Sequence, residues 1–97
     1  MNDAINNAIV RKRITFYGQV QGVGFRFRAK LAAKTFGCTG WIRNEYDNTV
    51  LMEIQGTESA ISDVLDFIDE GNYIRIDRTD VEVITPEHGE HRFYTLY

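Results

Sequence analysis

A glycine-rich stretch, GQVQGVGFR, spans residues 18–26 and ends in an arginine. Glycine permits positive φ angles and close approach to the backbone, so successive N–H groups can converge on an anion. Arg26 would add a planar guanidinium, which can hold a phosphoryl group through two hydrogen bonds. The simpler alternative is a tight turn that needs glycine only for its backbone shape. The residue types therefore raise the hypothesis of an anion site built from backbone amides and Arg26.

Two familiar nucleotide-binding motifs do not fit this stretch. Gly22-Val23-Gly24 is only part of the dinucleotide fingerprint, because the third glycine is missing and Arg28 stands in its region. The Gly-Lys-Ser/Thr ending of a nucleoside-triphosphate loop is also missing. Residues 24–27, GFRF, look like the aromatic motif of an RNA-recognition sheet, but here they are expected to open a helix. The stretch thus shares the physics of phosphate loops without matching a nucleotide motif.

The other reactive side chains give weaker signals. Cys38 begins a C-x₄-R pattern, whereas a thiol phosphatase of the C-x₅-R type needs the arginine where Asn44 stands. A cysteine at the start of a strand is more often simply small and buried. His88 and His91 lie in a polar segment without cysteines or a carboxylate cluster at ligand spacing, so a solvated loop is a simpler interpretation than a metal site.

The glycine stretch is expected to join a strand to the start of a helix. Residues 11–20 alternate apolar and polar side chains, which is typical of a half-buried strand. Apolar residues then recur at helical steps: Phe25, Ala29, Ala32 and Phe36. This spacing predicts a helix that ends at Gly37. A helix N-terminus carries free N–H groups and a partial positive charge, so the junction favours anion binding.

The middle of the chain predicts a hairpin and a second helix. Residues 39–46 and 50–55 form two expected strands, joined by a tight turn at Asp47-Asn48. Thr57 can cap a helix that ends at Gly71. The apolar positions of this helix follow the i, i+3, i+4, i+7 pattern: Ile61, Val64, Leu65 and Ile68.

The last part of the chain predicts two more strands. Residues 73–84 are rich in β-branched side chains, and their apolar parity changes between Ile76 and Val81, which predicts a bulge or bend. Residues 93–97 are expected to form a short edge strand. The order β-α-β-β-α-β predicts a ferredoxin-like α+β sandwich, an antiparallel sheet with both helices on one face. We expect residues 1–10 to be a flexible leader and residues 11–97 to be the single domain.

Composition limits the possible partners and the location of the protein. With 97 residues and 43 % hydrophobic content, the chain suits one small domain with one core. The net charge of −3 argues against nucleic-acid binding, whose usual footprint is strongly basic. The N-terminus has no apolar run long enough for a signal peptide or a membrane span, and the single cysteine fits a reducing compartment. We therefore expect a cytoplasmic protein without a membrane partner.

The charges are unevenly distributed along the chain. No acidic residue occurs between Ala4 and Asn44, whereas most acidic residues come later, several of them in the second predicted helix. The basic residues of the first part are Arg11, Lys12, Arg13, Arg26, Arg28, Lys30, Lys34 and Arg43. They could create a positive field around the glycine stretch, which would attract an anion. Composition alone slightly favours the alternative, solvated helix faces of opposite sign that partly neutralise each other.

From about Arg13 onwards the chain resembles the acylphosphatase family. The matching pieces agree in order and spacing: GQVQGVGFR (18–26), GWIRN (40–44), YDNTV (46–50), EIQG (53–56) and the Gly71 region. The resemblance implies the ferredoxin-like fold and hydrolysis of the carboxyl–phosphate anhydride of small acyl phosphates. It implies no metal or organic cofactor, and we expect a monomer. The chain departs from the family at Asn48, where glycine is usual, but asparagine also tolerates left-handed geometry.

The resemblance also assigns roles to residues. Arg26 corresponds to the phosphate-binding arginine of the family, and Asn44 to its water-positioning asparagine. The amide loop of the family corresponds to Gln21, Gly22, Val23, Gly24 and Phe25, together with Arg26. Without the resemblance, a strand-end asparagine that prepares the hairpin turn would be the simpler interpretation of Asn44.

Two alternatives remain open at this point. The same scaffold could be a non-catalytic phosphate- or anion-binding regulatory module, since fold does not fix function. Retention of Asn44 argues against this, because binding alone does not need it. The chain could also resemble the acylphosphatase-like domain of the larger carbamoyl-transferring maturation proteins, which its short length disfavours.

Overall fold

The computed structural model describes residues 8–97 of the chain. Its elements in order are β1 (Ile9–Gln19), α2 (Phe25–Phe36), β2 (Thr39–Asn44), β3 (Val50–Thr57), α3 (Glu58–Asp69), β4 (Arg75–Ile84) and β5 (Phe93–Leu96). Most of the expected leader, residues 1–7, lies outside the described residues. The prediction of a flexible leader is wrong for Ile9 and Val10, because both residues belong to β1 and pair with β3. No helix in this part of the chain has the length and apolarity needed to span a membrane.

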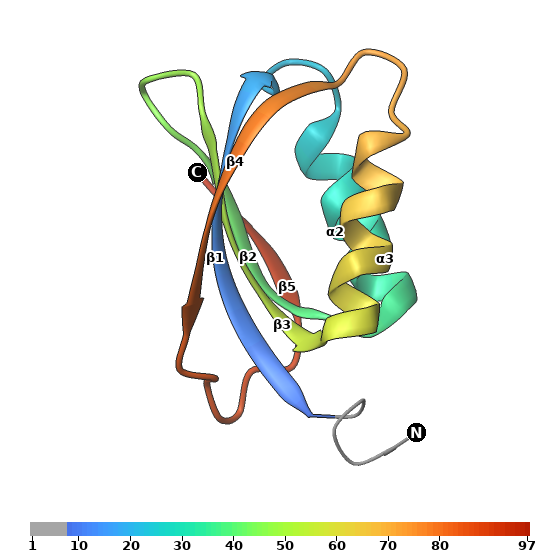
Figure 1. Ribbon diagram of the computed structural model, residues 1–97, viewed down its shortest axis with the longest axis vertical. Helices are drawn as coiled ribbons and strands as arrows, with labels where there is room; N and C mark the ends of the chain where they lie inside the picture. Colours follow the sequence, from blue (N-terminus) through green and yellow to red (C-terminus); the bar gives the residue numbers. More distant parts are fainter. Residues whose placement is uncertain (1–7) are drawn as a thin grey trace.

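The strands form one sheet in the order β4-β1-β3-β2-β5, and α2 and α3 cover one of its faces (Figure 1). β1 is antiparallel to both β3 and β4, and β2 is antiparallel to β3. β5 runs parallel to β2, so the sheet is mixed rather than purely antiparallel. The predicted ferredoxin-like α+β fold is confirmed. The predicted edge strand after residue 92 is β5, which adds a fifth strand to the sheet beside β2.

The core lies between the sheet and the two helices. Ile14, Phe16 and Val20 from the first strand region are each 1 % exposed, as their alternation predicts. The buried residues of the helices are Phe25, Ala29, Ala32, Ala33, Ile61, Val64 and Ile68. Phe36 differs from the prediction: it is the last residue of α2 and is 38 % exposed.

The predicted end of α2, the predicted cap of α3 and the predicted bulge are present, whereas α3 ends at Asp69 with Glu70 as its C-cap, before the predicted Gly71. Gly37 ends α2 with φ 75°, and the Thr57 hydroxyl accepts a hydrogen bond of 3.1 Å from the Ala60 N–H at the start of α3. The pairing of β1 with β4 shifts register between Tyr17 and Gly18. A side chain at Gly18 would place its Cβ 2.2 Å from a β4 carbonyl oxygen, so this close approach requires glycine.

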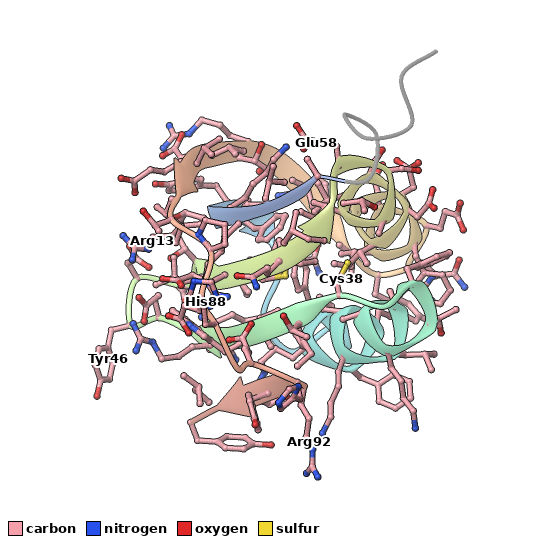
Figure 2. All side chains as sticks on the ribbon, turned by 90° about the horizontal axis from the view of Figure 1, so that it is seen from below. Arg13, Cys38, Tyr46, Glu58, His88 and Arg92 are labelled. Atoms are coloured by element: carbon pink, nitrogen blue, oxygen red, sulfur yellow. The ribbon has the colours of Figure 1, made fainter. Side chains whose placement is uncertain are left out.

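Arg11 is fully buried although it lies on the sheet face away from the helices. The residues between β4 and β5 cross this face at the end shown at the bottom of Figure 1, and Figure 2 shows His88 of that connection in front of the strands. Arg11 donates hydrogen bonds to Glu53 (2.9 Å), Gln55 (3.0 Å) and Glu90 (2.8 Å). Arg13 donates to the other Glu53 oxygen at 2.8 Å. This outer-face ion network fastens the connection that brings β5 to β2.

The outer-face ion network makes stability depend on pH through Glu53. Burial alone would raise the pKa of Glu53, but hydrogen bonds from Arg13 and Arg11 outweigh it, and the pKa lies below its ordinary value of 4.5. A carboxyl group with a lower pKa in the folded state stabilises the fold above its unfolded pKa. This contribution is lost as the pH falls through the folded pKa. Urea unfolding should therefore give a free energy that decreases below about pH 4.5. Glu53→Gln should show a shallower decrease, and an equal slope in both proteins would contradict this assignment.

Candidate active site

A cavity of about 390 Å³ lies where β1 gives way to α2. It is lined by Val20, Gly22, Gly24, Phe25, Arg26, Phe27, Lys30, Asn44, Thr95 and Tyr97. These residues come from three parts of the chain: the glycine stretch with the first turns of α2, the end of β2, and β5 with the residue after it. The cavity thus brings together Arg26 and Asn44, the two residues that the sequence singles out.

The glycine stretch forms a tight loop that ends as the N-terminus of α2. Gly22 and Gly24 have φ angles of 72° and 82°, in the left-handed region that other residues rarely adopt. A Cβ at either position would meet no atom within 4 Å, so glycine is needed for its backbone angle rather than for space. Val23, between them, packs against the core and anchors the loop.

The loop leaves backbone N–H groups available at the cavity. Gly24 is the N-cap residue of α2, and no side chain caps this end of the helix. The first N–H groups of a helix have no partner within it, and they carry a partial positive charge. Within residues 8–97, the N–H groups of Gly22, Val23 and Gly24 also make no backbone hydrogen bond outside the regular elements. The arrangement can bind an anion through its amides.

Arg26 lies in the first turn of α2 and borders the same cavity. Its guanidinium carbon lies 5.3 Å from the centroid of the Tyr97 ring. No acidic residue occurs in the first turn of α2, and no carboxylate of the described residues pairs with Arg26. The guanidinium is therefore free to bind an anion at the helix N-terminus.

Asn44 ends β2 beside this loop. Its side-chain oxygen, Oδ1, is buried, and it has no hydrogen-bond partner among the residues that the structure describes. An unsatisfied buried acceptor costs about 1–3 kcal/mol, so such atoms are rare unless they serve a ligand. Asn44 precedes the predicted turn, in which Asn48 has φ 71° and Asp47 Oδ1 accepts a 3.1 Å hydrogen bond from the Thr49 N–H. The turn conformation is thus supported by Asp47 and Asn48 rather than by the Asn44 side chain.

Gln21 has a role that its sequence position does not reveal. Its side-chain amide donates to the carbonyl oxygens of Glu45 and Thr49, each at 2.8 Å. Both acceptors belong to the β2–β3 hairpin that carries Asn44, so Gln21 fixes the glycine loop relative to Asn44. Gln21 itself does not line the cavity. A glutamine before glycine carries no local signal for such a long-range contact, and only the three-dimensional structure reveals it.

Most of the basic residues before residue 45 are engaged elsewhere. Arg11 and Arg13 pair with Glu53 on the outer face, where Figure 2 shows Arg13 on the side away from the helices. Arg28 donates to the Phe67 carbonyl at 2.7 Å and lies 4.2 Å from the Phe67 ring, so it joins the two helices. Arg43 pairs with a neighbouring glutamate. Arg26 and Lys30 are the members of this basic set that line the cavity.

The other candidates for chemistry lie outside this cavity. Cys38 is buried, and burial, followed by the charge of Asp63, raises the pKa of its thiol to about 11. A thiol with this pKa stays protonated near neutral pH and is a poor nucleophile. His91 borders a second cavity with Lys34, and within residues 8–97 no group of three His, Cys, Asp or Glu side chains could hold a metal ion.

Comparison with known proteins gives a consistent result. The chain matches the acylphosphatase family over residues 12–95. An acylphosphatase of Geobacillus kaustophilus is 38 % identical over 88 residues, which cover 90 % of this chain and 94 % of the relative. An acylphosphatase of Clostridium perfringens is 40 % identical over 88 residues, which cover 90 % of this chain and 99 % of the relative. The crystal structure of acylphosphatase from Bacillus subtilis has a TM-score of 0.82 at 29 % identity, and the match covers 91 % of this chain and 99 % of that one. The resemblance seen in the sequence is confirmed, and the chain belongs to the acylphosphatase family of enzymes.

Proposed function

We propose that this acylphosphatase hydrolyses small acyl phosphates to a carboxylate and inorganic phosphate with Arg26, the glycine loop and Asn44. The observation that carries the proposal is the buried Oδ1 of Asn44, which has no partner among residues 8–97. It shares the cavity with a helix N-terminus and with Arg26, which pairs with no carboxylate of the same residues. The helix N-terminus and the arginine suit a phosphoryl group. The acceptor suits the hydrogen of a water molecule that attacks this group.

The phosphoryl group is held by charge and by fixed donors. Amides of the residues from Gly22 to Phe25 would bind two of its oxygens, and the Arg26 fork would bind the remaining charge. Phosphoryl transfer depends mainly on positioning and on stabilising the phosphoryl oxygens in the transition state. Donors that are in place before the reaction need no reorganisation during it.

Asn44 orients the nucleophile. Its Oδ1 accepts a hydrogen bond from water, whose oxygen then attacks phosphorus as the bond from phosphorus to the carboxylate oxygen breaks. The amide is neutral and cannot remove a proton, so the proton passes to a phosphoryl oxygen of the substrate. The leaving carboxylate is stable as an anion and needs no acid. These features support hydrolysis without a histidine or cysteine in the cavity.

Replacing Asn44 by alanine tests this function. We expect kcat for benzoyl phosphate to fall at least about 100-fold, roughly 3 kcal/mol in the barrier, because the water loses its orientation. Binding of inorganic phosphate should change little. The free energy of unfolding should not decrease by more than about 1 kcal/mol, because the substitution removes an unsatisfied buried acceptor. A steady-state phosphate-release assay and urea unfolding measure the two effects.

A second asparagine of the same hairpin provides the control. Asn48→Gly keeps a residue that favours positive φ in the turn and lies outside the cavity, so it should retain the activity of the parent protein. Near-normal turnover by Asn44→Ala would defeat the role of Asn44. Loss of activity in Asn48→Gly equal to that in Asn44→Ala would show that hairpin shape, not the Asn44 oxygen, controls hydrolysis.

A further inference from the structure

Lys30 borders the cavity together with Arg26. It lies four residues after Arg26 on α2, and its side chain is exposed. Residues at this spacing lie on the same side of a helix with Cβ atoms about 6 Å apart. No acidic residue lines the cavity, and within residues 8–97 no carboxylate pairs with Lys30. The cavity therefore carries a second positive charge one turn beyond the first.

Lys30 lies one helical turn beyond Arg26, farther from the N-terminus of α2. The phosphoryl group belongs at the N-terminus of α2, where the free amides and Arg26 lie. The exposed Phe27 and Tyr97 rings line the same cavity as Lys30 and offer apolar surface in it. A cavity of about 390 Å³ leaves room for an acyl group beside the phosphoryl group. This part of the cavity thus combines apolar walls with a cation.

We propose that Lys30 selects acyl phosphates whose acyl group carries a second anionic group, a carboxylate or a phosphate, away from the anhydride. The inference rests on the proposed function, because it assumes that the phosphoryl group binds at the N-terminus of α2. An uncharged acyl group leaves Lys30 without a partner, whereas an anionic one pairs with it. The selection is a difference in affinity for the two kinds of substrate, and it resides in one side chain.

The second cavity supplies a matched control. Lys30 also borders a neighbouring cavity of about 450 Å³, together with Lys34 and His91. Lys34 is one further turn along α2, is exposed like Lys30, and does not line the first cavity. Replacing Lys34 by glutamine removes the same charge from the same helix. It therefore separates the local effect of Lys30 from a general change in the positive field.

The test compares benzoyl phosphate with 4-carboxybenzoyl phosphate. The measured quantity is the ratio of kcat/KM for the carboxylated substrate to kcat/KM for the plain one. Differences in chemical reactivity between the substrates cancel when this ratio is compared across variants. We expect the ratio to fall about five-fold in Lys30→Gln, the size of a partly exposed ion pair, and to stay unchanged in Lys34→Gln. Added salt should lower the ratio in the parent protein but not in Lys30→Gln.

A third substrate, 4-phosphonobenzoyl phosphate, distinguishes the two anionic groups. The substrate with the larger fall in Lys30→Gln identifies the group that Lys30 prefers, and Lys30→Arg should preserve most of the ratio. An unchanged ratio in Lys30→Gln, with benzoyl phosphate still hydrolysed, would overturn the inference and leave the proposed function intact. Equal falls in Lys30→Gln and Lys34→Gln would also overturn it. A parent protein that hydrolyses none of the substrates would overturn the proposed function.

Discussion

Replacing Arg26 by alanine is expected to lower kcat/KM for benzoyl phosphate at least about 100-fold. Arg26 has no carboxylate partner among the described residues and lies at a helix N-terminus without an acidic side chain. Its guanidinium is therefore the side-chain charge that would meet the phosphoryl oxygens. The contact of its guanidinium with Tyr97 is to an exposed ring, so the free energy of unfolding should change by less than about 1 kcal/mol.

Two other variants show whether the guanidinium itself is responsible. Arg26→Lys keeps the positive charge but loses the planar fork, so it should recover only part of the activity. Arg28→Gln, two residues along α2, removes the contacts with Phe67 that join the helices. It should lower the free energy of unfolding by about 1 kcal/mol and retain hydrolysis at temperatures where the protein is folded. Near-normal turnover by Arg26→Ala in a phosphate-release assay would refute the assignment.

Replacing Arg11 by methionine is expected to lower the free energy of unfolding by about 3–5 kcal/mol. The Arg11 side chain is completely buried, and the side chains of Glu53 and Glu90 are only 7 % and 10 % exposed. Removing the guanidinium would leave Glu90 without this ion pair and Glu53 with Arg13 as its remaining cation, and both carboxylates have little access to water. Such uncompensated charges are among the most destabilising changes in a folded protein. Urea unfolding at neutral pH measures the loss.

The adjacent lysine is the natural comparison for Arg11. Lys12 pairs with Glu58, whose side chain is 66 % exposed, so Lys12→Met should cost less than about 1 kcal/mol. A triple substitution, Arg11→Met with Glu53→Gln and Glu90→Gln, should recover part of the loss because it leaves neither buried carboxylate without a partner. A loss below about 1 kcal/mol in Arg11→Met would show that the outer-face ion network contributes little to stability.

The regular elements could be predicted from the sequence because their signals are local. The helical repeat from Phe25 to Ala32, the Gly37 end and the Thr57 cap each depend on neighbours within a few residues. The parity change in β4 is local too, and the register shift beside Gly18 confirms it. The parallel pairing of β5 with β2 is not local. It depends on a connection that crosses the whole sheet and is fastened by Arg11.

The site could be predicted only in part because several of its contacts join residues that are far apart in the sequence. Arg26 and Asn44 lie in matching pieces of a family pattern, and the structure brings them to one cavity. The side-chain contacts of Gln21 with the hairpin, and the presence of Lys30 at the cavity, depend on how separate elements pack. Arg11 was expected only as a basic residue near the start of a strand. Its complete burial follows from a covering segment about eighty positions away in sequence.

β5, with the residue after it, forms one wall of the cavity. It has four residues at an edge of the sheet, and such elements open locally at a lower free energy than the core. Because Thr95 and Tyr97 line the cavity, a molecule with β5 detached lacks part of the site. A ligand that contacts this wall binds only the docked form and therefore raises its population by mass action. We therefore expect substitution of Arg11, which pairs with Glu90 just before β5, to lower substrate affinity by reducing the fraction of molecules in which β5 is in place.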